Sequence, residues 1–148
     1  MTAAVYEGTP SGGNVEIISR DGDCTVYRLC DGAGEILMTR YAVFPGIELV
    51  YNDVHMQSCF APGMQSGNIF KINHCREGRV ECEFEDRYCC LTSGDLVLSQ
   101  AAGGGRGFYF PTSHYHGISI IIDVDKAPEC LSCFLDDVTV SPAALAEK

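Results

Sequence analysis

Residues Ile72 to Leu96 read INHCREGRVECEFEDRYCCLTSGDL and carry the clearest β-pattern in the chain. Apolar residues alternate with polar ones in two runs, and turn sequences stand at Arg76–Arg79 and Thr92–Asp95. A third apolar run, FYFPTSHYHGISIIID at Phe108–Asp123, follows after a short loop. Short alternating runs separated by turns are typical of a small antiparallel β-barrel. A barrel of this size often encloses a small ligand or a metal.

The length and charge of the chain limit its class. With 148 residues and 16.0 kDa it is long enough for one domain with its own core and too short for two. Its 20 acidic residues against 10 basic ones give a formal net charge of −10. A chain with this negative charge is expected to bind a phosphate backbone poorly. Any contact with DNA therefore requires another segment.

Nine cysteines raise the question of the redox compartment. The N-terminus MTAAVYEGTPSGGN has neither the basic nor the apolar region of a signal peptide, so we expect a reducing cytoplasm and cysteines that pack as buried thiols. Redox sensing is the alternative, but the CxxC at Cys130–Cys133 lacks a second pair. No apolar run reaches membrane-spanning length; the nearest candidate is Ile118–Ile122.

Composition divides the chain into three parts. Residues 1–14 are rich in Gly, Thr, Ser and Pro and predict a flexible arm, residues 15–125 predict the barrel, and residues 126–148 predict helices. Pro128 suits the start of a helix that ends at Asp137, and Ser141-Pro142 resembles the start of a second helix. We expect turns at Arg20–Asp23, Asp31–Gly34 and Pro45-Gly46, and loops at Ala61–Asn68 and Gly103–Gly107.

The strand expected around Ile47–His55 has polar groups on both faces. One face carries Ile47, Leu49, Tyr51, Asp53 and His55, and the other carries Glu48, Val50, Asn52, Val54 and Met56. This mixture is expected where one face lines a wet cavity. In the Val80–Glu85 run, the apolar residues are expected inward, and the acidic ones are expected in solvent.

Seven polar side chains are our candidates for ligand binding inside the barrel. They are Tyr51, His55, His74, Arg76, Tyr88, His114 and His116. Arg76 is the strongest candidate of the seven. An arginine among His and Tyr groups in an apolar cup suits a carboxylate or another small anionic or polar molecule. The alternative is that Arg76 stands exposed in the turn before Glu77-Gly78.

His114 and His116 form an HxH pair that would share one face of a strand. Such a pair can chelate zinc or nickel but needs two further ligands, for which His74, His55 and the cysteines are candidates. Sequence distance does not show that these residues converge. We therefore predict no metal, no other cofactor and no catalytic residue, with His114 and His116 hydrogen-bonding a ligand or packing at the barrel mouth.

Three segments resemble the effector-binding domain of AraC/XylS-type transcriptional regulators of a Gram-positive gut-bacterial type. They are CREGRVECEF, the SGDL turn and FPTSHYHGISIIID, within a similarity that covers roughly Glu35 to the C-terminus. The resemblance implies a mainly β fold: a cupin-like jelly-roll barrel, antiparallel, with one or two C-terminal helices. It also implies a homodimer, a small-molecule effector, and DNA binding only through a helix-turn-helix domain that would follow Lys148.

The cupin motifs of this resemblance have lost their metal ligands. Aligned on Gly78, the glutamate position falls at Lys71, and no histidine occurs at residues 64–67, where the His pair would stand. Aligned on Gly94-Asp95, the later positions hold Gln100, Ala102 and Gly105; only His114, reached by allowing the Gly-rich insertion, could stand in for the last ligand, and one histidine does not bind a metal tightly. The sequence thus favours a ligand-sensing domain. Two alternatives stay open: a free-standing cupin-type metal-dependent isomerase or oxygenase, and a dimerisation module with a vestigial pocket.

Overall fold

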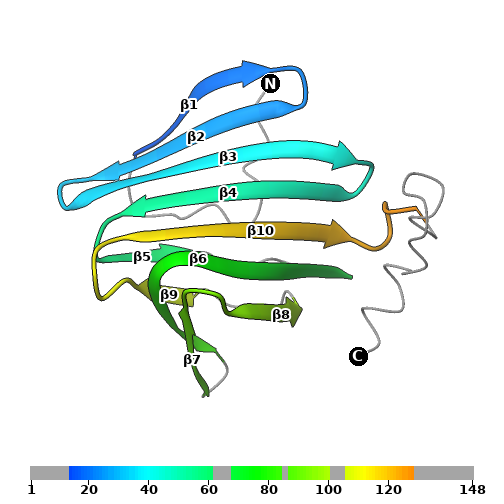
Figure 1. Ribbon diagram of the computed structural model, residues 1–148. Helices are drawn as coiled ribbons and strands as arrows, with labels where there is room; N and C mark the ends of the chain where they lie inside the picture. Colours follow the sequence, from blue (N-terminus) through cyan, green and yellow to red (C-terminus); the bar gives the residue numbers. More distant parts are fainter. Residues whose placement is uncertain (1–13, 62–67, 85–86, 101–105, 129–148) are drawn as a thin grey trace.

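The computed structural model describes residues 14–61, 68–84, 87–100 and 106–128, which form ten strands and no helix (Figure 1). The strands are β1 (Asn14–Asp21), β2 (Cys24–Asp31), β3 (Gly34–Phe44), β4 (Ile47–His55), β5 (Ser58–Ala61), β6 (Ile69–Phe84), β7 (Arg87–Thr92), β8 (Leu96–Gln100), β9 (Arg106–Tyr109) and β10 (Tyr115–Asp123). All pairings are antiparallel, so the prediction of a mainly β, antiparallel fold is confirmed.

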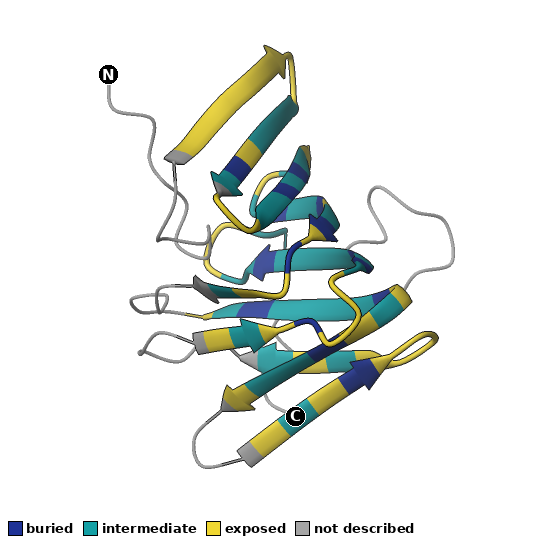
Figure 2. Cartoon of the chain, turned by 90° about the vertical axis from the view of Figure 1, so that its left-hand side faces the viewer, coloured by how far each residue is buried: buried dark blue, intermediate teal, exposed yellow. Residues whose placement is uncertain are grey.

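Two curled sheets share one strand. The long sheet has the order β1-β2-β3-β4-β10-β6-β8, and the short sheet has the order β5-β9-β6-β7. The first half of β6 pairs with β10 and β8, and its second half pairs with β7 and β9. In Figure 1 the short sheet lies toward the left-hand end of the long strands. β1 stands at the open edge and is exposed from Val15 to Asp21 (Figure 2).

The predicted turn at Arg76–Arg79 is wrong, because strand β6 continues through these residues. A β-bulge between Cys75 and Glu77 inserts Arg76 opposite the His116–Gly117 step of β10, and Gly78 follows with a φ of 84°. A bulge bends a strand and increases its twist, which carries β6 from the long sheet into the short one. A glycine with positive φ serves a bulge as well as a turn, and the sequence did not distinguish them.

The other predicted turns are confirmed. Tight turns connect β1 to β2, β2 to β3 and β3 to β4, with positive φ at Gly22 and Gly46. At Thr92–Asp95, the backbone N–H of Asp95 donates to the carbonyl of Thr92, and both the N–H and the hydroxyl of Thr92 donate to the Asp95 carboxylate. The two bonds to the carboxylate, first that from the Thr92 N–H and then that from its hydroxyl, lower the pKa of Asp95.

We expect the Asp95→Asn variant to be slightly less stable than the parent at pH 7. The folded-state pKa of Asp95 lies below the ordinary aspartate value of about 3.9. The carboxylate therefore contributes its full stabilisation of the folded state above that pH. This stabilisation is lost as the pH falls through the lowered pKa. Urea unfolding of both proteins at several pH values should therefore show a stability gap that closes on acidification. A gap that stays constant between neutral pH and about pH 3 would contradict this account.

The main core lies between the two sheets. The long sheet contributes Leu29, Ile36, Met38, Val50, Val54, Cys75 and Tyr115, and these pack with Met56, Val80, Leu91 and Phe110. Burial raises the pKa of the Cys75 thiol and of the Tyr115 hydroxyl, so both groups stay protonated. We call the core-packing side of the long sheet its inner face and the opposite side its outer face.

Strand register assigns the remaining side chains to these two faces. Paired residues of neighbouring strands project to the same side. Val54 pairs with Ile36 and with Tyr115, so the even-numbered residues of β4 lie on the inner face. The odd-numbered residues of β4, including Tyr51 and His55, therefore lie on the outer face.

Seven of the nine cysteines are described, and all seven are free thiols. Cys75 is buried, five others are half-buried and Cys90 is exposed, so the prediction that all cysteines are buried is wrong. Cys90 is turned outward because neighbouring residues of β7 alternate sides. Cys130 and Cys133 lie outside the described residues.

Several expected segments also fall outside the described part of the chain. These are the arm up to residue 13, residues 62–67 of the first loop, residues 103–105 of the glycine-rich loop, and both helices except Pro128. Arg106 and Gly107, expected in that second loop, belong to β9. In the described part, nothing helical is long and apolar enough to cross a membrane.

Candidate functional site

A row of polar side chains crosses the inner face of β4, β10 and β6. Asn52 donates from Nδ2 to Ser119 Oγ over 3.0 Å, and the Ser119 hydroxyl donates to Asn73 Oδ1 over 2.7 Å. Ser119 pairs with Asn73 in the strand register, which brings the two side chains to one side. The three side chains fix one another's orientation while remaining half-buried.

An ion pair extends this row on β3 and β4. Arg40 Nε lies 3.2 Å from Glu48 Oε2, and the side chains are only 12% and 19% exposed. The Arg40 guanidinium also lies 6.0 Å from the centre of the Tyr27 ring. Removing two charges from water is costly, and close contact between them offsets that cost. The buried Arg40–Glu48 pair, with the Tyr27 ring beside the guanidinium, therefore marks a polar centre within the inner face.

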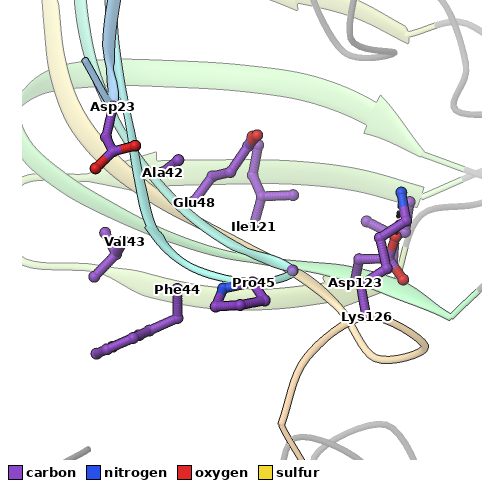
Figure 3. A pocket seen from close by; sticks show the side chains of 11 residues that line it. Asp23, Ala42, Val43, Phe44, Pro45, Glu48, Ile121, Asp123 and Lys126 are labelled. Atoms are coloured by element: carbon purple, nitrogen blue, oxygen red, sulfur yellow. Dashed lines mark ion pairs between the residues drawn. The ribbon is translucent and has the colours of Figure 1, made fainter.

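A cavity of about 430 Å³ opens beside this ion pair, at the Pro45-Gly46 end of the long sheet (Figure 3). Its lining includes Phe44 and Ile121, together with the charged groups of Asp23, Glu48, Asp123 and Lys126. Lys126 Nζ lies 3.4 Å from Asp123 Oδ2. Glu48 joins the cavity to the ion pair with Arg40, and Asp123 faces Lys126, so of the three lining carboxylates that of Asp23 leaves the cavity with one negative charge in excess.

The sequence missed this inner site. It placed Tyr51 and His55 inside the barrel, and the structure places them outside, which corrects the prediction. A shift of one residue in a strand reverses both faces, so assigning the wrong face exchanges every side chain. A usable signal existed: Val50, Val54 and Met56 make the even-numbered face of β4 the more apolar one.

The other predicted site residues are dispersed. Tyr51 and His74 lie on the outer face, where the Tyr51 ring packs edge-on against Tyr41 at 5.9 Å. Arg76 is exposed in the β6 bulge, as the alternative interpretation expected. Tyr88 lies on β7 of the short sheet, is 71% exposed, and donates its hydroxyl to Glu81. None of the four contacts the inner cavity.

Three predicted residues do come together: His55, His114 and His116. One ring nitrogen from each lies within 4.8 Å of the others, and the His114 and His116 ring centres are 4.6 Å apart. Asp53 and Glu77 join this group: Asp53 Oδ1 lies 2.6 Å from His116 Nε2, and Glu77 Oε2 lies 3.3 Å from His114 Nε2. Neither carboxylate is predicted as a site residue from the sequence. The cluster lies on the outer face, so it is a separate site from the cavity.

Comparison with solved structures shows the cupin fold. The chain is similar to a cupin superfamily protein from Desulfitobacterium hafniense, with TM-score 0.51, 9% identity, and coverage of 64% of this chain and 84% of that one. It is also similar to a predicted oxalate decarboxylase from Thermotoga maritima, with TM-score 0.50, 15% identity, and coverage of 72% and 98%.

A third similar structure is an HTH_3-family transcriptional regulator from Vibrio cholerae, with TM-score 0.48, 15% identity, and coverage of 57% of this chain. The matched part spans only 50% of that regulator's length. No protein-family model and no curated protein sequence matches the chain. At these identities, the comparisons establish the fold and leave the activity open.

Proposed function

We propose that this chain is a ligand-sensing cupin domain that binds a small polar molecule in its inner-face cavity. The observation that carries the proposal is the Arg40–Glu48 ion pair, mostly buried and continuous through Glu48 with a cavity large enough for a metabolite. Small-molecule sites are typically concave, largely apolar, and supplied with a few fixed polar groups. Phe44 and Ile121 supply the apolar wall here.

The charges of the cavity favour a particular class of ligand. Asp23, Glu48 and Asp123 contribute carboxylates, which accept hydrogen bonds and attract cations. We therefore propose a polyhydroxylated or amine-bearing molecule. This replaces the anionic ligand expected from Arg76, because that guanidinium stands exposed in the β6 bulge, away from the cavity.

A sensor also needs a path from its ligand to the rest of the protein. The end of β10 and the residues after it lie against the β3–β4 turn: the N–H of Asp123 donates to the Gly46 carbonyl over 2.8 Å, and a Cβ built on Gly46 would lie 2.5 Å from the backbone nitrogen of Ala127. Asp123 and Lys126 line the cavity, so a ligand there would contact the chain that leads onward to residue 129. A ligand that prefers one arrangement of this segment would shift its population.

On the basis of the resemblance to AraC/XylS-type regulators, we propose that the domain works as a homodimer without enzymatic activity. In that arrangement a helix-turn-helix domain supplied by further sequence would contact DNA. The net charge of −10 is consistent with a domain that leaves DNA binding to another segment.

A thermal-shift screen tests the proposal. We expect a sugar, polyol or amine from a metabolite panel to raise the melting temperature by about 5 °C or more at 100 times its Kd. The Ala42→Phe variant should abolish that shift, because Ala42 lines the cavity and the larger ring would fill it. Asp23→Asn should weaken it, because one lining carboxylate is removed.

Arg76→Ala is the matched control, because Arg76 is exposed and lies away from the cavity. Its ligand-induced shift should equal that of the parent. The proposal is overturned if the panel yields no stabilising compound, or if every hit survives Ala42→Phe unchanged.

A further inference from the structure

We propose that Asp53, His55, His114 and His116 form a binding site for one divalent transition-metal ion on the outer face of the long sheet. The four side chains come from the His55 end of β4, from the turn before β10 and from the start of β10. The site goes beyond ligand sensing in the cavity, because it lies on the opposite face of the sheet.

The strand register brings the four side chains together. Asp53 and His55 stand two residues apart on β4, so they project to the same side. His116 pairs with Asp53 across the β4–β10 ladder, and so reaches that same side. The convergence follows from ladder pairing between residues far apart in the sequence.

His114 is placed by a turn that precedes β10. Ser113 has a φ of 54°, and its N–H donates to the Phe110 carbonyl over 2.9 Å. The Thr112 hydroxyl donates to the carbonyl of His114 itself over 3.0 Å. The turn therefore holds His114 beside His116 instead of leaving it on a free loop.

The distances in the cluster suit a shared cation. Asp53 Oδ1 lies 2.8 Å from His55 Nε2 and 2.6 Å from His116 Nε2, so two imidazoles point at one carboxylate oxygen. His114 adds a third ring nitrogen within 4.8 Å of the other two. Ligand atoms bound at about 2.0–2.2 Å from one tetrahedral metal lie about 3.3–3.6 Å apart, so the three ring nitrogens are close enough to share an ion, and the Asp53 carboxylate must draw back from the two imidazoles by up to about 1 Å to admit it.

Two atoms of the cluster lack ordinary partners. Asp53 Oδ1 and His116 Nε2 are both shielded from solvent, and neither makes a hydrogen bond of acceptable geometry despite their 2.6 Å separation. Buried polar atoms are costly when unsatisfied. Coordination of both atoms to one cation, with the slight separation described above, would satisfy each of them.

Glu77 supplies an outer partner. Its Oε2 lies 3.3 Å from His114 Nε2 and 3.5 Å from His116 Nδ1. Since His116 turns Nε2 toward Asp53, its Nδ1 is available to donate to Glu77. Carboxylates that accept from the second ring nitrogen orient metal-binding histidines in this way. The β6 bulge places Glu77 opposite His116.

The donor set defines the class of metal. Three imidazoles and one carboxylate suit zinc, nickel, copper or cobalt, whereas calcium and magnesium prefer sites built from oxygen. Apart from His114, the site is also distinct from the cupin-motif positions. Lys71, which aligns with the motif glutamate, pairs with Ile121, and Ile121 lines the inner-face cavity.

Titration of the intact chain with Zn²⁺ under reducing conditions tests the site, followed by Co²⁺ as a spectroscopic probe. We expect one Zn²⁺ per chain, and a Co²⁺ spectrum without a thiolate charge-transfer band. His55→Gln and His116→Gln should each weaken binding at least about 100-fold, the upper end of the cost of losing an outer partner. Glu77→Gln should weaken it about 10-fold.

His74→Gln is the matched control, because His74 is the remaining histidine of the chain and lies on the same face outside the cluster. It should bind Zn²⁺ like the parent. Circular dichroism would verify folding, and Asp53→Asn replaces any histidine variant that fails to fold. A thiolate band, equal affinities in cluster and control variants, or no binding by the parent would overturn the proposal.

Discussion

The Gly78→Ala variant is expected to lose about 3 kcal/mol or more of folding stability, a large part of what a domain of this size has. Gly78 has a φ of 84°, and a Cβ built on it would lie 2.1 Å from the His114 carbonyl oxygen and 3.0 Å from Tyr115 Cα. Those atoms are backbone, so the clash can be relieved only by separating β6 from β10.

Urea unfolding measures this effect, with Gly107→Ala as the matched control. A Cβ on Gly107 meets nothing within 4 Å, so that variant should stay within about 0.5 kcal/mol of the parent. Equal midpoints for Gly78→Ala and the parent would show that Gly78 does not pair closely with β10.

The second large effect is expected at the inner-face ion pair. Arg40→Ala should cost about 3 kcal/mol or more, because it leaves the Glu48 carboxylate, 19% exposed, without its counter-charge. Replacing both residues by methionine should restore most of the loss, since apolar side chains of similar size often substitute well for a buried ion pair. Denaturant unfolding of the three proteins provides the measurement.

The Arg28–Glu35 ion pair serves as a control on β2 and β3. Its atoms are 3.2 Å apart, but its side chains are 44% and 40% exposed. Arg28→Ala should therefore cost much less stability than Arg40→Ala. If Arg40→Ala costs no more than Arg28→Ala, the inner-face pair is not the buried polar centre on which the proposed function depends.

The sequence predicted the fold well where local chemistry determines the backbone. The Asp-Gly turn before Cys24, the Pro45-Gly46 turn and the Thr92–Asp95 turn depend on neighbouring residues, and all three are confirmed. The turn predicted at Arg76–Arg79 failed because Gly78 acquires its role from β10, a strand much later in the chain.

The site was harder to predict because it depends on long-range register. Alternation correctly grouped Asp53 with His55, but it could not say which face of β4 meets the core. The pairing of His116 with Asp53, and of Ser119 with Asn73, is a property of the assembled sheet. The HxH pair could therefore be identified from the sequence, whereas its partner Asp53 and the inner-face polar row could not.

The most direct test of the central claim is a nuclear magnetic resonance titration with the compound that stabilises the chain most. Ala42, Gly46 and Lys126 line the cavity and carry backbone amide groups, and the four histidine rings of the chain are reporters away from the cavity. We predict that the backbone amide resonances of Ala42, Gly46 and Lys126 shift saturably while the histidine ring resonances stay in place. Shifts confined to the histidine rings would contradict a ligand site on the inner face.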